Sequence, residues 1–277
     1  MAHIVWLASY PKSGNTWLRA VYTALSTHSA PDINTLDSSE ISSSRWLFDR
    51  ALGVRSSDLT AEETDLLRAR VDELSAEQSG SDRWRKIHDA LQVPGADGPI
   101  VSRTATKMAL YLLRDPRDVA VSLARQTGRD LAWAVRHLGD SQASLESGPR
   151  SLPAQFRQYL GSWSYHVKSW TEQTWFPVHV LRYEDCVSDP VGTFGAAFSA
   201  AGLGAAQDEI AEAVGRCSWG RLRAQEDETG FRENEYKARP FFRRGIAGGW
   251  VDELGAELAA QVAADHHEVM ARFGYAI

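Results

Sequence analysis

A polar loop near the N-terminus places a lysine, a glycine and two hydroxyl side chains between an apolar run and a helical pattern. It reads SYPKSGNTWL over residues 9–18 and follows the apolar residues 4–8. Backbone N–H groups and the positive end of a helix dipole converge at such a junction and bind phosphate. Lys12 adds a mobile positive charge, and Ser13 and Thr16 add hydroxyl donors. The loop therefore predicts an anion site.

Two other interpretations of this loop differ in what they explain. A Walker A loop needs Gly, four residues and then Gly-Lys-Ser/Thr, whereas here Lys12 precedes Gly14. An ordinary polar turn between a strand and a helix would explain Gly14 but not the combination of Lys12, Thr16 and Trp17. The spacing favours a phosphate loop of another type.

A second candidate anion site occupies residues 111–122, YLLRDPRDVAVS. The apolar run ends at Arg114, Pro116 suits the first turn of a helix, and Ser122 lies two turns into that helix. An arginine at the carboxyl end of a parallel strand faces the crevice where open α/β sheets bind ligands. The alternative is that Arg114 forms only a helix-capping ion pair with Asp115 or Asp118.

A third basic segment, FFRRGIAGGW, covers residues 241–250. Two adjacent cations, Arg243 and Arg244, and glycines that include Gly245 suit a loop whose backbone closely approaches an anion. A solvated basic turn is the alternative interpretation.

One histidine has the position of a general base. His88 ends a short β-like run that includes Lys86. Its imidazole, with an ordinary pKa of about 6.5, suits proton abstraction near neutral pH. The alternative is a polar residue that merely ends a strand.

Together these segments resemble the sulfotransferase family, whose members move a sulfuryl group from 3′-phosphoadenosine 5′-phosphosulfate (PAPS) to an acceptor. The first loop resembles the family's 5′-phosphosulfate loop, and residues 111–122 resemble its 3′-phosphate element. Residues 241–250 look like its Arg-Lys-Gly-x-x-Gly-Asp-Trp segment, with Arg244 in place of lysine and Gly249 in place of aspartate. With Asn15 in the first loop, the chain looks closest to bacterial members that modify small molecules, including natural-product tailoring enzymes.

The resemblance also implies roles for individual residues. His88 would take the acceptor proton, Lys12 would follow charge onto the leaving oxygen, and Lys86 would assist at the sulfonate. Trp17 and Trp219 would stack on adenine, as planar side chains do with bases. The residues implied in nucleotide binding are Lys12, Ser13, Gly14, Asn15, Thr16, Trp17, Arg114, Ser122, Tyr183, Ser218, Trp219, Arg243, Arg244 and Gly245.

The elements that must position these residues alternate between short β-rich runs and helical patterns. This order predicts a single α/β domain over residues 1–277 with a central, largely parallel sheet flanked by helices. The resemblance implies the P-loop NTPase-like sulfotransferase fold. The predicted strands are Ile4–Ser9, Trp84–His88, Ala109–Arg114 and Val178–Tyr183.

Helices and loops follow from periodicity and turn residues. Thr60 and Glu63 predict a capping box before a helix with Leu66, Leu67, Val71 and Leu74 inward. Longer helices are expected over Pro153–Thr174 and Asp252–Phe273. Asp37–Ser44, Gly139–Pro153 and the charged Arg223–Pro240 segment are predicted loops, and residues 223–240 are a candidate mobile lid.

Composition limits the classes of partner. The chain has 277 residues, 43% hydrophobic, enough for one large core. Its net charge of -6 gives no general attraction to nucleic acid. Cys186 and Cys217 are too few for a disulfide framework, and no metal-ligand cluster occurs. No run reaches the ~20 apolar residues of a membrane helix. We expect a cytoplasmic enzyme with no metal and no membrane span.

The functional prediction is sulfuryl transfer from PAPS to a hydroxyl of a small-molecule acceptor, with adenosine 3′,5′-bisphosphate (PAP) as product. Two alternatives remain open. A P-loop-like small-molecule kinase would share the fold but prefer ATP. A non-catalytic nucleotide-binding protein would bind PAP and transfer nothing.

Overall fold

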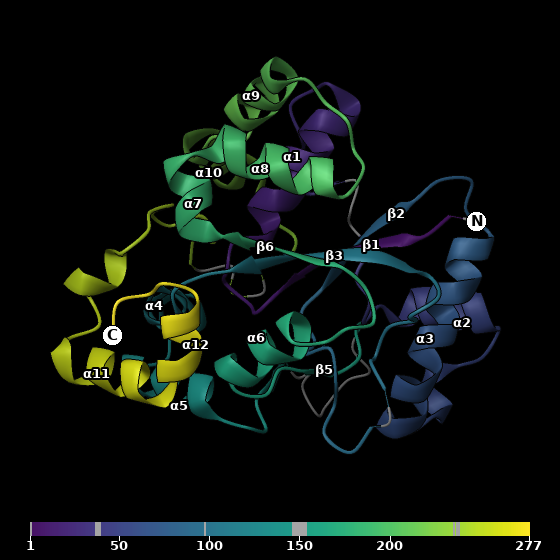
Figure 1. Cartoon of the computed structure of the whole chain (residues 1–277), viewed down its shortest axis with the longest axis horizontal. Coiled ribbons are helices and arrows are strands. Elements are labelled where there is room, and N and C mark those ends of the chain that lie inside the picture. The colour runs from purple at the N-terminus through teal and green to yellow at the C-terminus, as the bar shows by residue number, and fades with distance from the viewer. Residues whose placement is uncertain (1, 37–39, 97, 146–153, 235, 237–238) are drawn as a thin grey trace.

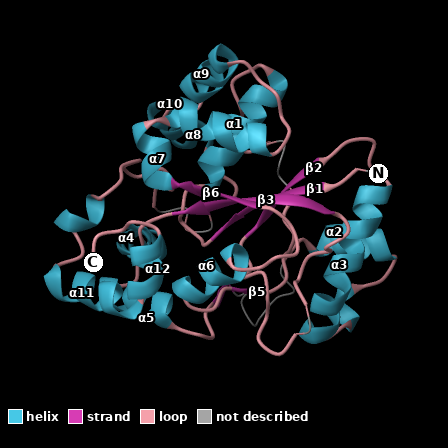
Figure 2. Cartoon of the chain, in the orientation of Figure 1, coloured by secondary structure: helices cyan, strands magenta, loops and turns pink. Residues whose placement is uncertain are grey.

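Four parallel strands form the central sheet of the computed structural model, in the order β2–β1–β3–β6 (Figure 2). They are β1 (Ile4–Ser9), β2 (Arg83–Ile87), β3 (Thr106–Leu113) and β6 (Val178–Arg182). The structure describes residues 2–36, 40–96, 98–145, 154–234, 236 and 239–277. The predicted strands and their parallel arrangement are confirmed, with ends shifted by up to a few residues.

Helices surround the sheet. They are α1 (Asn15–Thr27), α2 (Arg45–Leu52), α3 (Ala61–Glu77), α4 (Pro116–Thr127), α5 (Leu131–Gly139), α6 (Trp163–Thr171), α7 (Tyr183–Ser188), α8 (Pro190–Ala200), α9 (Gln207–Arg216), α10 (Trp219–Thr229), α11 (Ala256–Asp265) and α12 (His267–Arg272). Short 3₁₀ turns occupy Ser56–Asp58 and Gly249–Asp252, and a two-stranded antiparallel pair joins β4 (Ser144–Leu145) to β5 (Gln158–Tyr159).

The sheet separates two hydrophobic cores, because side chains along a strand alternate between its faces. On β1, Ile4, Trp6 and Ala8 pack with residues of α4, α5, α6, α11 and α12. Val5 and Leu7 face α1, α8, α9 and α10 on the other side. Figure 1 shows these two helical layers above and below the strands, with α2 and α3 at the right-hand side below the strands. The predicted single α/β domain is thus a three-layer arrangement.

The helix expected over Pro153–Thr174 is much shorter. Gln158–Tyr159 pairs as β5, Gly161 has a φ of 62°, and α6 begins only at Trp163 after the N-cap Ser162. A left-handed residue cannot continue a right-handed helix, so the apolar spacing over residues 156–160 belongs to an extended segment. Pro153 itself lies outside the described residues, as do residues 37–39 and 146–153 of two predicted loops.

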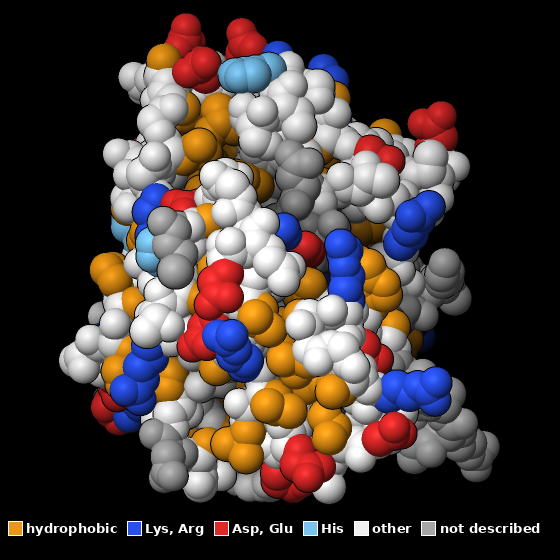
Figure 3. All heavy atoms as spheres, turned by 90° about the vertical axis from the view of Figure 1, so that its right-hand side faces the viewer, with side chains coloured by type: hydrophobic (Ala, Val, Ile, Leu, Met, Phe, Trp, Pro, Cys, Tyr) orange, Lys and Arg blue, Asp and Glu red, His pale blue; other side chains and the backbone are white. Residues whose placement is uncertain are grey.

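The capping box of α3 is confirmed, but its predicted inward face is partly wrong. Thr60 and Glu63 form both reciprocal hydrogen bonds. Val71 is buried and Leu67 and Leu74 are half-buried, whereas Leu66 is 78% exposed. Exposed apolar side chains gather on this face of the molecule, over α2 and α3 (Figure 3). The buried side of α3 instead carries charged residues, which a hydrophobic pattern cannot reveal.

Two further predicted segments differ. The C-terminal helix expected over Asp252–Phe273 is divided into α11 and α12, because His266 leaves the helical conformation with a φ of -120°. The loop expected over residues 223–240 is helical in its first part, since α10 extends to Thr229. Mobility of the rest of that segment stays a prediction.

Candidate active site

The loop between β1 and α1 has a backbone conformation suited to an anion. Lys12 has a φ of 71° and Gly14 a φ of 103°. A non-glycine residue in this region is uncommon and indicates a functional constraint. A Cβ on Gly14 would also lie 2.8 Å from the ring of Tyr183, so glycine is required on both counts. The loop leads directly into the N-terminus of α1, where backbone N–H groups are open to a ligand.

Several buried polar atoms around this loop lack a protein partner in the described part of the chain. They are Ser13 Oγ, Trp17 Nε1 and Arg114 Nε. Buried donors are nearly always satisfied in native proteins, so a cluster of unsatisfied ones indicates a ligand or water at this place. The residues present therefore fit a bound phosphate-bearing molecule.

Lys12 lies over an aromatic ring rather than in open solvent. Its ammonium is 3.8 Å from the centroid of Phe241, a cation–π contact. Loss of solvation, together with the positive charge of Arg114, lowers the pKa of Lys12 to about 7. Glu226 in α10 holds this arrangement, because its carboxylate accepts hydrogen bonds from the backbone N–H of Phe241 at 2.6 Å and Phe242 at 2.9 Å. An anion placed beside Lys12 would stabilise its charged form.

Arg114 links the three basic segments. Its guanidinium donates to the carbonyl oxygen of Lys12 at 3.1 Å and to that of Ile246 at 3.0 Å. It also lies over the ring of Tyr183, with 4.2 Å from Cζ to the ring centroid. The structure therefore brings together Lys12, Arg114, Tyr183 and the segment after Arg244.

Asp118 explains how the third segment is held although Gly249 replaces an aspartate. Its carboxylate accepts hydrogen bonds from the N–H groups of Gly248 at 2.8 Å and Trp250 at 2.9 Å. Asp118 also lies 3.7 Å from Arg114, so the ion pair considered as an alternative for Arg114 exists beside its other contacts. The anchoring carboxylate comes from α4 rather than from the segment itself.

Arg243 and Arg244 are paired with acidic residues. Glu253 Oε1 lies 2.7 Å from Arg243 Nη1 and 3.0 Å from Arg244 Nη1, and Arg125 is 3.0 Å from the other oxygen. Gly245 packs against the indole of Trp219, where a Cβ would approach to 2.2 Å. The segment 243–245 and the start of α10 are thus neighbours.

His88 lies immediately after β2, beside the first loop. Its Nδ1 is 2.9 Å from the carbonyl oxygen of Ser9 and 3.3 Å from Ser9 Oγ. Asn15 holds Ser9 in turn, since its amide donates to Leu7 O and to Ser9 Oγ. Burial, followed by the positive charge of Lys86, lowers the pKa of His88 well below 6.5. The imidazole is therefore neutral at pH 7.

A buried hydrogen-bond network fixes the backbone at His88. His166 in α6 donates from Nε2 to the His88 carbonyl oxygen at 3.0 Å, and its Nδ1 accepts from the Tyr111 hydroxyl at 2.8 Å. Arg68 binds the carboxylate of Asp89 with both terminal nitrogens, at 2.9 and 2.8 Å. The position of His88 is thus determined from both sides of the chain.

The remaining predicted residues occupy varied positions. Lys86 is paired with Glu233 at 2.8 Å. Ser122 is half-buried in the second turn of α4, and Ser218 is the exposed N-cap of α10. Trp17 packs edge-on against Tyr183 and Phe194, while Trp219 is 42% exposed. The stacking of the two tryptophans on opposite faces of adenine stays a prediction.

Three carboxylates, Glu226, Glu233 and Glu253, organise this site although the sequence interpretation gave them no role. Each holds a cation or an N–H group of the predicted segments. The available signal was their number close to clustered arginines and lysines, because buried cations require nearby acids.

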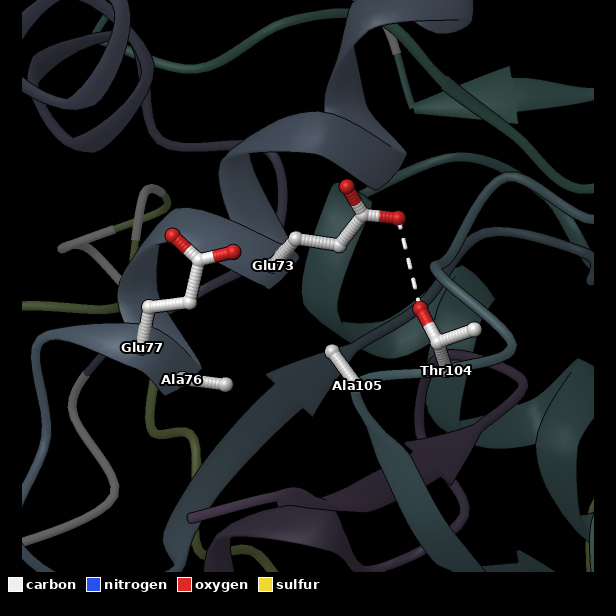
Figure 4. A pocket seen from close by; sticks show the side chains of 5 residues that line it. All are labelled: Glu73, Ala76, Glu77, Thr104 and Ala105. Atoms are coloured by element: carbon white, nitrogen blue, oxygen red, sulfur yellow. Dashed lines mark hydrogen bonds between the residues drawn. The ribbon is translucent and has the colours of Figure 1, made fainter. Parts of the chain in front are cut away.

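A separate cavity of about 280 Å³ lies elsewhere, between α3 and the residues before β3 (Figure 4). It is lined by Glu73, Ala76, Glu77, Thr104 and Ala105, and Glu73 accepts a hydrogen bond from Thr104. Its carboxylates would repel a phosphate. Within the described residues, no group of three or more His, Cys, Asp or Glu side chains could hold a metal ion.

The fold and this geometry define a class of protein, an α/β protein with a phosphate-type anion site between β1 and α1 and a neutral histidine beside it. The family model for the sulfotransferase domain matches residues 3–274. The chain therefore belongs to the sulfotransferase family. Both the predicted family and the predicted enzyme class, a PAPS-dependent sulfotransferase, are confirmed.

Individual relatives agree with this assignment. The chain is 24% identical to cytosolic sulfotransferase 1 of Arabidopsis thaliana over 274 residues, which cover 92% of this chain and 75% of that protein. For cytosolic sulfotransferase 8 of the same plant, the identity is 26% over 273 residues, with 92% and 73% covered.

Solved structures share the fold. Retinol dehydratase in complex with androsterone and the inactive cofactor PAP superposes with a TM-score of 0.63 at 20% identity, over 96% of this chain and 80% of that one. A mouse sulfotransferase complexed with PAP gives a TM-score of 0.59 at 18% identity, over 97% and 85%. In the described part of our chain, no helix has the length and apolar character needed to cross a membrane.

Proposed function

We propose that this sulfotransferase transfers the sulfuryl group to a hydroxyl of a small-molecule acceptor, with His88 as the general base. The observation that carries the proposal is the hydrogen bond from His88 Nδ1 to the carbonyl oxygen of Ser9, at 2.9 Å. One structural neighbour, retinol dehydratase, binds small molecules, since its two complexes contain androsterone or retinol. This neighbour supports a small-molecule acceptor here.

The hydrogen bond assigns the tautomer of His88. A carbonyl oxygen only accepts, so Nδ1 carries the proton and Nε2 is the basic nitrogen. In the proposed step, the acceptor oxygen forms a bond to sulfur and its proton passes to His88 Nε2. The bond between sulfur and the bridging oxygen breaks, and that electron pair stays on the 5′-phosphate of PAP. Nucleophile, sulfur and leaving oxygen lie roughly in line, as in phosphoryl transfer.

The first loop would stabilise the charge that develops on the leaving side. Lys12 stands at this loop, and the open N–H groups at the start of α1 come from Gly14, Asn15 and Thr16. Preorganised donors that face a developing charge lower the barrier without reorganisation during the reaction. Arg114, Ser122, Arg243 and Arg244 would bind the 3′-phosphate, and Tyr183, Trp17 and Trp219 would contact the base. We propose no metal for this transfer.

A direct test incubates the purified protein with ³⁵S-labelled PAPS and fractionated extract of its source cells. We expect a labelled small molecule whose formation is insensitive to a metal chelator. In a parallel incubation with γ-³²P-labelled ATP, transfer of the labelled phosphoryl group would instead support a kinase. Binding of PAP without any labelled product from any fraction would support a nucleotide-binding protein without catalysis.

The role of His88 is tested by His88→Ala. Without the base, turnover should fall by roughly 10²–10⁴ while the Kd of PAP changes little. His179→Ala is a matched control, because that histidine is in β6 and has no proposed role. A His88→Ala enzyme that sulfates an alcohol at the normal rate would remove His88 from the mechanism.

A further inference from the structure

Glu233 connects two basic residues that belong to different elements, α1 and β2. It lies in the segment after α10, and its carboxylate contacts Arg19 Nη1 of α1 at 2.7 and 2.9 Å. The same carboxylate lies 2.8 Å from Lys86 Nζ of β2. Arg19 is 1% exposed and Lys86 13% exposed, whereas Glu233 is 33% exposed. Three separate elements therefore meet at one carboxylate.

This carboxylate stays ionised. Burial would raise the pKa of Glu233, but the charges of Lys86 and Arg19 outweigh burial and lower it to about 2. Arg19 alone would already require a counter-ion, because an unpaired buried charge is strongly destabilising. The additional contact with Lys86 is not needed to neutralise Arg19, so it requires a second explanation.

Lys86 lies in β2 two residues before His88, and its positive charge acts on the imidazole of His88. A positive charge beside an imidazole opposes uptake of a proton, and a negative charge favours it. Glu233 supplies a negative charge beside the ammonium of Lys86.

We propose that Glu233 is a positioning residue for sulfuryl transfer, which holds the Lys86 ammonium in place and offsets its charge so that His88 can accept the proton of the acceptor. This inference rests on the proposed role of His88 as the base. Glu233 touches neither the donor nor the acceptor in this role. It acts through Lys86 and through its field at the imidazole.

The other groups that face His88 do not supply this compensation. His166 of α6 is neutral, because loss of solvation lowers its pKa to about 4. Asp89 directs its carboxylate to Arg68. Lys12, from the first loop, is a cation whose charge and that of Lys86 act on each other. Glu233 contacts Lys86, and its negative charge favours uptake of a proton by His88.

The test measures the protonation of His88 directly by NMR, with ¹⁵N-labelled histidine in the PAP complex and His88→Gln to assign the signal. Glu233→Gln should lower the titration midpoint of His88 by about one pH unit, and Lys86→Met should raise it by about the same amount. The double variant should return toward the wild-type midpoint, as expected for a coupled pair.

Glu40→Gln is a matched control. Glu40 is also 33% exposed and bridges Arg83 and the fully buried Arg85, but it contacts neither Lys86 nor His88 through its side chain. Its loss should lower the Tm and leave the His88 midpoint unchanged. If Glu233→Gln lowers only the Tm, Glu233 is merely the counter-ion of Arg19 and the proposal is wrong.

Lys86→Met keeps Arg19 paired and covers the case in which Glu233→Gln does not fold. If the His88 midpoint is the same in Lys86→Met and wild type, or if His88 does not titrate above pH 4.5 in any variant, the proposal is also wrong. These readouts need no acceptor. Full activity of His88→Ala would instead contradict the base itself, which separates the two failures.

Discussion

The two ends of the proposed nucleotide site differ in how far they are preorganised before a ligand binds. At the 5′ end, the loop of residues 9–18 presents Ser13 Oγ, which is buried and lacks a protein partner among the described residues. At the 3′ end, Arg114 Nε is likewise buried without such a partner, but Arg243 and Arg244 are about one-third exposed and already paired with Glu253.

This difference indicates different energetics at the two ends. Buried donors at the 5′ end gain hydrogen bonds on binding without losing any to the protein, and their geometry is fixed by β1 and α1. At the 3′ end, a bound phosphate competes with an existing carboxylate for the same cations. This competition reduces the net gain in binding free energy. We therefore expect substitutions at the 5′ end to affect turnover, and those at the 3′ end to affect nucleotide affinity.

The largest effect within this comparison should come from Lys12→Ala. Lys12 would meet charge that grows as the sulfuryl group departs, so its loss should reduce kcat by roughly 10²–10³, as for other groups that stabilise a developing anion. The Kd of PAP should change much less, because the N–H groups of the loop still hold the 5′-phosphate. Steady-state kinetics and calorimetry measure the two quantities.

Lys107→Ala is a suitable control for Lys12→Ala, because Lys107 is an exposed lysine paired with Asp82 at the far end of β3. If Lys12→Ala weakens PAP binding and leaves kcat unchanged, Lys12 is only an anchor. The proposed difference between a catalytic 5′ end and a nucleotide-binding 3′ end would then be wrong.

Arg114→Ala should have the next largest effect, on affinity. Removal of one partner from a desolvated charged pair costs about 2–5 kcal/mol, so PAP should bind roughly 30-fold more weakly or worse. The loss should vanish for adenosine 5′-phosphosulfate, which has no 3′-phosphate. Titration of wild type and variant with both nucleotides forms a double-mutant cycle.

The wild type should accordingly prefer the 3′-phosphorylated nucleotide by a similar factor, and Arg272→Ala should leave that preference unchanged. Arg272 pairs with Glu172 and belongs to α12, without a proposed role in binding. Equal affinity of the wild type for the two nucleotides would show that Arg114 stabilises the protein and does not bind a 3′-phosphate. The proposed 3′-phosphate site would then be wrong.

The sequence predicts the elements well where one face of an element is simply apolar. β1 and β3 are buried along nearly their whole length, so their apolar pattern is sufficient to predict them, whereas β2 and β6 are only partly buried. The α3 face and the region before α6 fail for different reasons. Arg68 and Asp72 are buried through ion pairs made with β2 and the residue after His88, and such tertiary partners leave no local signal. Gly161 interrupts an apolar spacing that suits a helix.

For the site, the motifs were visible because a loop that binds an anion is built from consecutive residues. Their mutual contacts were implied only by the resemblance, and the structure now gives the bond from Arg114 to the Lys12 carbonyl oxygen. The sequence shows acidic residues close to clustered basic ones, but it does not assign their partners. Glu226, Glu233 and Asp118 act across long sequence separations, so only the folded chain shows which cation or N–H group each one meets.

The smallest predicted effect concerns Glu253, and it tests the 3′ end most directly. Its pKa is lowered below the ordinary value, because hydrogen bonds from Arg243, Arg125 and Arg244 outweigh the effect of burial. The carboxylate therefore carries a negative charge at pH 7 close to the proposed 3′-phosphate. Glu253→Gln removes that charge and keeps one oxygen that can accept a hydrogen bond.

We expect Glu253→Gln to bind PAP about 2–5-fold more tightly at low ionic strength, because the arginines no longer divide their charge between a carboxylate and a phosphate. The gain should shrink as salt is added, and the Tm should fall slightly. Asp227→Asn, which breaks a more exposed pair with Arg223 in α10, is the control and should not change the affinity. Weaker binding by Glu253→Gln would mean that the carboxylate mainly holds the arginines in position. In that case the 3′ end is as preorganised as the 5′ end, and the contrast between them lies in exposure alone.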